Sequence, residues 1–75
     1  MNISDILIHI TDNLNAQQCA ELEQALRQID GVIAPRFTPE KAHLLTIAFN
    51  PDLTNSATLC AQVQSFGYTA QLIGI

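Results

Sequence analysis

The chain has 75 residues, of which 48% are hydrophobic and 13% are charged, a composition typical of one small globular domain. Three Lys and Arg residues stand against seven Asp and Glu residues, so the formal net charge is −4 and we expect no nucleic-acid partner. No apolar segment approaches 18 residues and no basic residue precedes Arg27, so we expect a single cytoplasmic domain over residues 1–75, without a signal peptide or membrane insertion.

The first part of the chain predicts a strand followed by a helix. Hydrophobic side chains at every second position are typical of a half-buried strand, and they occur at Ile6, Ile8 and Ile10. Apolar residues then recur every three or four positions, which predicts a helix with its inward stripe at Cys19, Leu22, Leu26 and Ile29. We expect this helix to end at Asp30 and Gly31, because glycine readily adopts the left-handed conformation of a helix cap.

The middle of the chain predicts a β-hairpin. Residues 32–37 are its first strand, and Pro35 places that strand at a sheet edge, because proline has no N–H to donate to a neighbour. Residues 38–41 are expected to form the loop. The second strand of the hairpin shows alternating apolar positions at Leu45, Ile47 and Phe49.

A second helix and a last strand complete the chain. Either Thr54 or Asn55 can cap this helix. Its inward side chains are predicted to be Leu59, Val63 and Phe66, with Cys60 beside them. Gly67 should end the helix, and residues 68–75 are expected to form the fourth strand.

The two halves of the chain repeat one apolar pattern at a spacing of 37 residues, as in the pairs Ile8 with Leu45 and Leu22 with Leu59. A doubled strand–helix–strand unit predicts an α+β, ferredoxin-like βαββαβ fold. Right-handed crossovers would place both helices on one face of a four-stranded antiparallel sheet, with strand order 4-1-3-2 and the other face open.

Three short segments carry a resemblance to a known family: Leu-Glu-Gln-Ala-Leu at 22–26, Ile-Asp-Gly-Val at 29–32 and Phe-Gly-Tyr-Thr-Ala at 66–70. Through them nearly the whole chain resembles the heavy-metal-associated (HMA) domain. That family includes soluble copper chaperones, a mercury-binding relative and the N-terminal domains of metal-pumping P-type ATPases. The resemblance implies a loop of the pattern G-M-x-C-x-x-C between the first strand and the first helix, whose two thiolates hold a soft ion such as Cu(I).

Carboxamides occupy both thiolate positions of that loop in this chain. Counted back from Leu22 without gaps, the two positions fall on Asn15 and Gln18, while the glycine and methionine positions fall on Asp12 and Asn13. Carboxamides are poor ligands for soft ions, which select thiolates. Asn15 and Gln18 instead fit a capping box, in which each side chain accepts a hydrogen bond from the backbone N–H of the other residue. We therefore expect them to start the helix, and we predict no metal cofactor.

Cysteine and histidine are the remaining candidate metal ligands. Cys19 lies one residue past the second thiolate position, about 100° further around the helix, which turns it toward the packed stripe. A structural role is favoured for Cys19, and a reactive or metal-binding thiol is the alternative. Cys60 is predicted to be a buried core residue, and a Cys19–Cys60 disulfide stays open. His9, on the open sheet face, and His43, at a strand start, are expected to be solvated or interface residues, because no second ligand is recognisable for either.

The open sheet face is more apolar than a solvated surface requires, and no charge guards the edge of the last strand. We expect a homodimer or a protein partner to use this face or edge, and an unassociated, frayed terminus is the alternative. The residues expected at this interaction surface are Leu7, His9, Leu44, Thr46, Ala48 and Ile73.

The sequence shows no nucleophile turn and no glycine-rich phosphate loop, so we expect no enzyme. The leading hypothesis is a metal-site-deficient HMA-like domain that acts as a small protein-interaction or regulatory module. The alternative hypothesis is a soft-metal carrier in which Cys19 binds a copper-type ion together with a ligand from a second subunit.

Overall fold

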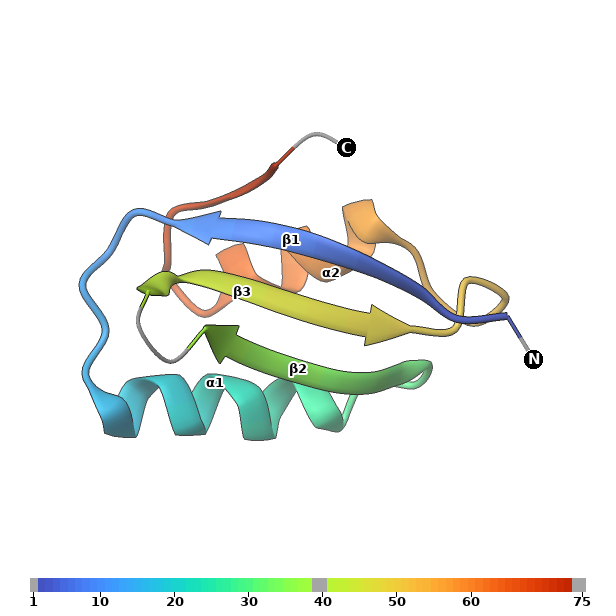
Figure 1. Ribbon diagram of the computed structural model, residues 1–75, viewed down its shortest axis with the longest axis horizontal. Helices are drawn as coiled ribbons and strands as arrows, with labels where there is room; N and C mark the ends of the chain where they lie inside the picture. Colours follow the sequence, from blue (N-terminus) through green and yellow to red (C-terminus); the bar gives the residue numbers. More distant parts are fainter. Residues whose placement is uncertain (1, 39–40, 74–75) are drawn as a thin grey trace.

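Strands and helices follow one another along the chain in the predicted order of strand, helix, strand, strand, helix, strand (Figure 1). This computed structural model describes residues 2–38 and 41–73. The elements are β1 (Ser4–Ile10), α1 (Ala16–Arg27), β2 (Val32–Thr38), β3 (Lys41–Phe49), α2 (Ser56–Ser65) and β4 (Ala70–Leu72).

All neighbouring strands of the sheet run antiparallel, in the order β2-β3-β1-β4. This is the predicted order 4-1-3-2 read from the opposite edge, so the ferredoxin-like fold is confirmed. The two helices cover one face of the sheet, with α2 behind β1 and α1 next to β2 in Figure 1. The other face has no covering element among the described residues.

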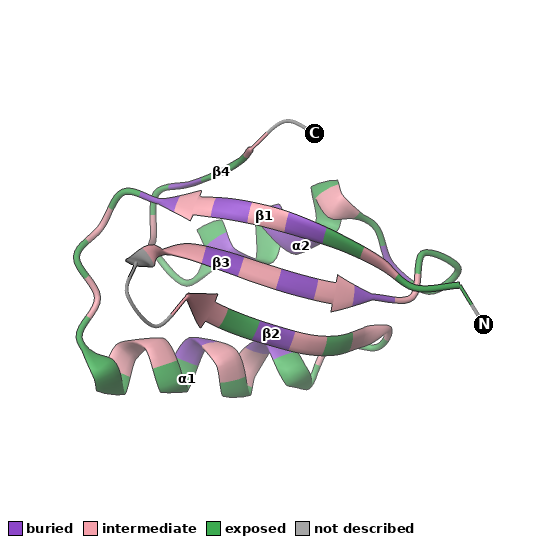
Figure 2. Cartoon of the chain, viewed as in Figure 1, coloured by how far each residue is buried: buried purple, intermediate pink, exposed green. Residues whose placement is uncertain are grey.

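Buried residues alternate with less buried ones along the central strands β1 and β3, as the colours in Figure 2 show. Along β1 and β3 the residues that point to the helices are buried, whereas those between them are mostly half-buried. The core of the described residues consists of Ile6, Ile8, Ile10, Leu22, Leu26, Leu45, Ile47, Phe49, Leu59, Cys60, Val63 and Ala70. Burying one large aliphatic side chain contributes about 1.5–3 kcal/mol, so this single layer supplies most of the hydrophobic stabilisation.

β2 forms one edge of the sheet, as Pro35 predicts. Pro35 pairs with Ile47 of β3 and is fully buried. The pairing shifts register between Val32 and Ala34 and again between Phe37 and Thr38, and such irregularities discourage an edge strand from pairing with another chain. The hairpin loop predicted over residues 38–41 falls partly on residues 39–40, which lie outside the described residues.

α1 ends earlier than the sequence predicts. Its last residue is Arg27, because the N–H groups of Gln28 and Ile29 bond to carbonyls three residues back and tighten the final turn. Gly31 (φ +95°) therefore does not cap the helix, as was expected, but is the third residue of a separate turn. The Val32 N–H closes this turn on the Ile29 carbonyl at 3.1 Å, and a positive φ at the third position is what a type II turn requires. Ile29 lies in this turn, half-buried against the core, and not in the helical stripe.

The end of α2 corrects a second prediction. The helix ends at Ser65, Phe66 is the C-cap, and Gly67 (φ +95°) follows as the left-handed residue. The Phe66 and Gly67 N–H groups bond to the carbonyls of Val63 and Gln64, three residues back. This tighter turn rotates the chain away from the helical stripe, so the Phe66 side chain is 46% exposed and not a core residue.

The last strand is shorter than predicted. Pairing with β1 covers Ala70–Leu72, and Tyr68 and Thr69 lie in the connection that precedes the strand. The Ile73 N–H donates to the Leu7 carbonyl at 2.9 Å, so contact with β1 continues one residue past β4. The end of the predicted strand, residues 74–75, lies outside the described residues.

Candidate functional site

The connection between β1 and α1 is the segment in which the HMA resemblance places a metal loop. Asn15 has an extended backbone (φ −81°, ψ 174°) and is the N-cap of α1. Its Oδ1 accepts a hydrogen bond from the Gln18 N–H at 2.7 Å, and Gln18 Oε1 accepts one from the Asn15 N–H at 3.0 Å. The predicted capping box is therefore present, and both carboxamide oxygens are engaged by backbone donors.

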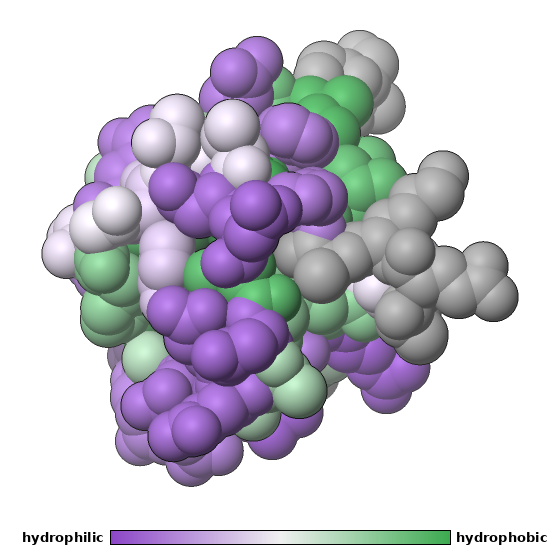
Figure 3. All heavy atoms as spheres, turned by 90° about the vertical axis from the view of Figure 1, so that its left-hand side faces the viewer, coloured by the Kyte–Doolittle hydropathy of each residue, from purple (hydrophilic) through white to green (hydrophobic). Residues whose placement is uncertain are grey.

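A second group of hydrogen bonds ties this loop to the connection between α2 and β4. The Thr69 N–H donates to Asp12 Oδ2 at 2.6 Å, and the Thr11 N–H donates to the Thr69 carbonyl at 3.0 Å. Asp12 occupies the position of the loop glycine in the resemblance. Here its carboxylate joins the β1–α1 loop to the connection between α2 and β4. Figure 3 shows that hydrophilic side chains cover much of this end of the molecule. These hydrogen bonds therefore hold the β1–α1 loop against the connection between α2 and β4.

Cys19 lies in the first part of α1, half-buried beside β2. The prediction that it turns into the packed stripe is wrong, since only Leu22 and Leu26 of α1 are buried. Burial and, secondly, the Glu23 carboxylate raise the pKa of the Cys19 thiol above its ordinary value of 9.0. Glu23 is held in place because its Oε2 accepts a hydrogen bond from the Phe37 N–H at 3.0 Å. At neutral pH Cys19 is therefore a thiol, whereas soft metals bind the thiolate.

Cys60 is buried in the core, as predicted, with 8% of its surface exposed. Its sulfur lies 3.8 Å from the Ala70 carbonyl oxygen, a weak hydrogen bond across to β4. Both cysteines are free, so the disulfide that the sequence left open is not formed. Cys60 therefore packs between α2 and β4.

The structure brings most of the expected interaction residues together on the open sheet face. Leu7 pairs with Thr46 and His9 pairs with Leu44 across β1 and β3, and all four are half-buried. Ile73 joins them through its backbone bond to Leu7. A shallow cavity of about 270 Å³ lies beside Leu7 and Thr46, and Asp5 and Ile6 complete its lining. The role of these residues in binding a partner stays a prediction.

His43 is the residue that sequence analysis failed to connect with His9. The centroids of the two imidazole rings are 6.0 Å apart and their planes differ by 26°. His43 Nδ1 lies 2.8 Å from the carbonyl oxygen of Ile10, the residue after His9. The sequence offers no second ligand for either histidine at helix or strand spacing, and the structure places the two side by side. Only the pairing of β1 with β3 reveals the contact, because no local spacing relates residues so far apart in the chain.

No family model and no curated protein matches the sequence, whereas solved structures match nearly the whole chain. The copper-binding domain from HMA7, a P-type ATPase, has a TM-score of 0.83 at 18% identity and covers 93% of each chain. The N-terminal domain of a potential copper-translocating P-type ATPase from Bacillus subtilis, in the Cu(I)-loaded state, has a TM-score of 0.82 at 21% identity, over 95% of this chain and 88% of that chain. Oxidized MerP from Ralstonia metallidurans CH34 has a TM-score of 0.81 at 14% identity, over 95% of this chain and 97% of that chain.

This chain has the HMA fold. The matched structures include metal-binding domains and metallochaperones. At such low identities the comparison establishes the architecture, and function has to be argued from the side chains that this chain places on the HMA fold.

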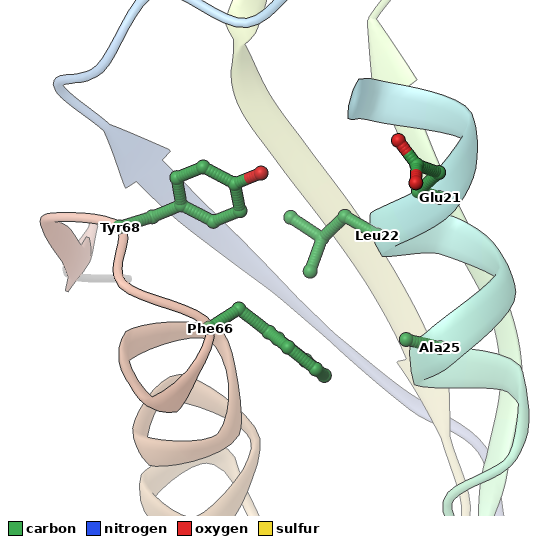
Figure 4. A pocket seen from close by; sticks show the side chains of 5 residues that line it. All are labelled: Glu21, Leu22, Ala25, Phe66 and Tyr68. Atoms are coloured by element: carbon green, nitrogen blue, oxygen red, sulfur yellow. The ribbon is translucent and has the colours of Figure 1, made fainter. Parts of the chain in front are cut away.

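A shallow cleft of about 260 Å³ lies between α1 and the connection that follows α2 (Figure 4). Phe66 and Tyr68 reach into it from one side, opposite Leu22 and Ala25 of α1. Among the described residues that line the cleft, only Glu21 is charged. The Tyr68 hydroxyl is the other polar side-chain group in its lining.

The described part of the chain contains no group of three or more His, Cys, Asp or Glu side chains placed to hold a metal ion. Within the same residues, neither α1 nor α2 has the length and apolar character needed to cross a membrane.

Proposed function

We propose that this chain is an HMA-fold interaction or regulatory module whose β1–α1 loop has no soft-metal site. The capping box is the observation that carries the proposal. In the resemblance, Asn15 and Gln18 stand where two thiolates would hold an ion. Here their oxygens accept backbone N–H groups at 2.7 and 3.0 Å, which makes them part of a helix start.

The chemistry of the neighbouring groups supports the same conclusion. Cu(I) selects thiolate sulfur, and an amide oxygen is a hard ligand that it binds poorly. Cys19 is the nearest sulfur in sequence to the capping box, and its raised pKa keeps it protonated at neutral pH. One thiol also supplies only half of a two-coordinate site, so a soft-metal carrier would need a ligand from a second subunit.

A competition titration against a chromogenic Cu(I) chelator, in reduced protein without oxygen, tests this half of the proposal. We expect no tight complex with one ion per chain. Tight binding that survives Cys19→Ser would contradict the proposal outright. Tight binding that Cys19→Ser abolishes, together with dimerisation that occurs only when Cu(I) is added, would instead establish the carrier in which two subunits share the ion.

The open sheet face and the β4 edge supply the interaction surface in this proposal. β4 ends the sheet, and its residues Ala70–Leu72 include no charged side chain. An unguarded edge of this kind is a template for a further strand. We propose that a second copy of the chain pairs along it, because an antiparallel pair of identical strands is self-complementary about a two-fold axis. The open-face residues, Leu7 and Ile73 among them, would then form a surface that continues across the dimer interface.

Sedimentation over a range of concentrations tests the interaction. We expect reversible dimerisation, and Ile73→Lys should weaken it at least tenfold while leaving the fold intact. The matched control is Ile33→Lys, since Ile33 is exposed on β2 at the opposite edge of the sheet, and it should leave the dimerisation constant unchanged. If the protein is a monomer at all concentrations, a second copy of the chain does not bind at this edge.

We further propose that residues 1–75 form one domain that works in the cytoplasm. Two cysteines in 75 residues are too few for the disulfide framework of a small secreted domain, which supports this location. Labelling the intact protein in cell fractions would check it.

A further inference from the structure

We propose that His9 and His43 form a binding site for a borderline divalent metal ion such as Zn(II), at the end of the sheet near the β1–α1 loop. The site uses neither of the carboxamide positions and neither cysteine. It rests on the contact between the two imidazole rings, whose centroids lie 6.0 Å apart. The proposal is independent of the missing soft-metal site.

The hydrogen bond of His43 prepares that ring as a ligand. The Ile10 carbonyl can only accept a hydrogen bond, so His43 Nδ1, at 2.8 Å, must carry the proton. In a neutral imidazole this leaves the lone pair on Nε2. Histidines that bind metal ions almost always donate their other ring N–H to a carbonyl or carboxylate, which sets the tautomer and the ring orientation. His43 has this arrangement before any ion arrives.

The distance between the rings fits a shared ion. A nitrogen ligand lies about 2.0–2.1 Å from zinc, and the centroid of its ring lies about 1.1 Å further away, so two rings on one ion have centroids no more than about 6.4 Å apart. At the tetrahedral angle the centroids are about 5.2 Å apart. The observed 6.0 Å lies between these two values. In the structure the two rings are stacked, so binding requires the half-buried His9 ring to turn out of this arrangement until a nitrogen of each ring points to one ion.

The ligand type decides which ions are accepted. Neutral imidazole nitrogen suits Zn(II), Cu(II) and Ni(II), and the net charge of −4 attracts cations in general. Two protein ligands leave the remaining positions to water, so we expect weaker binding than in a site with three or four protein ligands. Zn(II) is the appropriate probe, because it has no redox chemistry and leaves the two free thiols intact.

A Zn(II) titration of the reduced full chain, followed by NMR of the imidazole nitrogens, tests the site. We expect saturable binding of one ion per chain, with the largest shifts at His9 and His43. His9→Gln and His43→Gln should each weaken binding at least tenfold. His9→Gln leaves the bond between His43 and Ile10 in place, so it separates a lost ligand from a disturbed strand end. Cys19→Ser is the control and should change the affinity less than twofold.

Three results would overturn the proposal. The first is no saturable binding of Zn(II), and the second is an affinity that both histidine substitutions leave unchanged. The third is an affinity that Cys19→Ser abolishes, because the thiol would then be the ligand. A melting curve for each variant, recorded without metal, establishes that the affinities refer to folded protein.

Discussion

The two helices of this protein begin in the same way, although the resemblance places a metal loop before only one of them. Asn15 caps α1 and Asn55 caps α2, and each Oδ1 accepts the N–H of the residue three positions on, at 2.7 and 2.8 Å. The start of α1 differs by one additional bond, from the Asn15 N–H to the Gln18 side chain. The loop in the metal position is thus built as an ordinary helix start with one further hydrogen bond.

The segments that follow the two helices also share a feature and differ in its surroundings. Gly31 and Gly67 both have φ +95°. A Cβ on Gly31 would lie 2.8 Å from the Leu53 Cβ, whereas a Cβ on Gly67 would meet nothing within 4 Å. Each half of the repeat therefore has a left-handed glycine after its helix, once inside a packed contact and once in open space.

The largest effect on stability is expected when the start of α1 is given two metal ligands that the start of α2 lacks. Asn15→Cys combined with Gln18→Cys should create a Cu(I) site, because the helix N-terminus favours thiolate. The metal-free variant should lose about 0.5–2 kcal/mol with its cap, and Cu(I) at a thousand times its Kd should then add about 4.1 kcal/mol. Urea unfolding with and without Cu(I) measures both terms.

The control for this experiment is Asn15→Ala combined with Gln18→Ala, which removes the same cap without adding sulfur. It should lose stability and gain none from Cu(I). If the double-cysteine variant binds no Cu(I), the alignment that places Asn15 and Gln18 on the thiolate positions is wrong.

The next largest effect should separate the two glycines. Gly67→Ala should cost about 1–2 kcal/mol, the strain of a left-handed backbone in a residue with a Cβ. Gly31→Ala adds the collision with Leu53, and overpacking typically costs a further 1–3 kcal/mol, so we expect about 2–5 kcal/mol in total. Urea unfolding of both variants gives the comparison, and equal losses would show that Leu53 moves aside freely.

A smaller effect is expected from removing each cap alone. Asn15→Ala and Asn55→Ala should each cost about 0.5–2 kcal/mol, which for a domain of this size corresponds to several degrees in Tm. Asn15→Ala should be the more costly of the two, because it also loosens the geometry of the Gln18 bond. Thermal melts of the two variants decide the order, and a larger loss for Asn55→Ala would contradict the importance given to the second bond.

The smallest effect concerns Cys19. Its pKa is raised in the folded state, so the folded chain holds this proton more tightly than the unfolded chain. The resulting stabilisation is fully present below the ordinary value of 9.0 and is lost as the pH rises through the higher folded pKa. The loss of unfolding free energy between neutral and strongly alkaline pH should therefore be smaller in Cys19→Ala than in the natural sequence, and an identical loss would contradict the shift.

The central part of the fold was predictable because local patterns encode it. Alternation along β1 and β3 identified the core side chains, and Pro35 identified the edge strand. The Asn15 and Gln18 spacing predicted a bond pattern that is present in the structure. In each case the property depends on a few neighbouring residues.

The predictions that failed, or that could not be made, concern side chains whose position is set by tertiary contacts. Phe66 fits the helical stripe by spacing, but α2 ends one residue before it in a tighter turn. Cys19 fits the stripe of α1 but lies where β2 covers it only in part. The pairing of β1 with β3 brings His43 beside His9, and no periodicity within either strand contains that information.

A comparison of Asn15→Ser with Asn15→Ala tests the central claim most directly, that this position starts a helix. Serine caps helices about as well as asparagine, whereas alanine cannot accept the Gln18 N–H. We expect the free energy of unfolding of Asn15→Ser to lie within about 0.5 kcal/mol of the natural sequence, and that of Asn15→Ala to fall by about 0.5–2 kcal/mol. Equal stability of the alanine variant and the natural sequence would contradict the account.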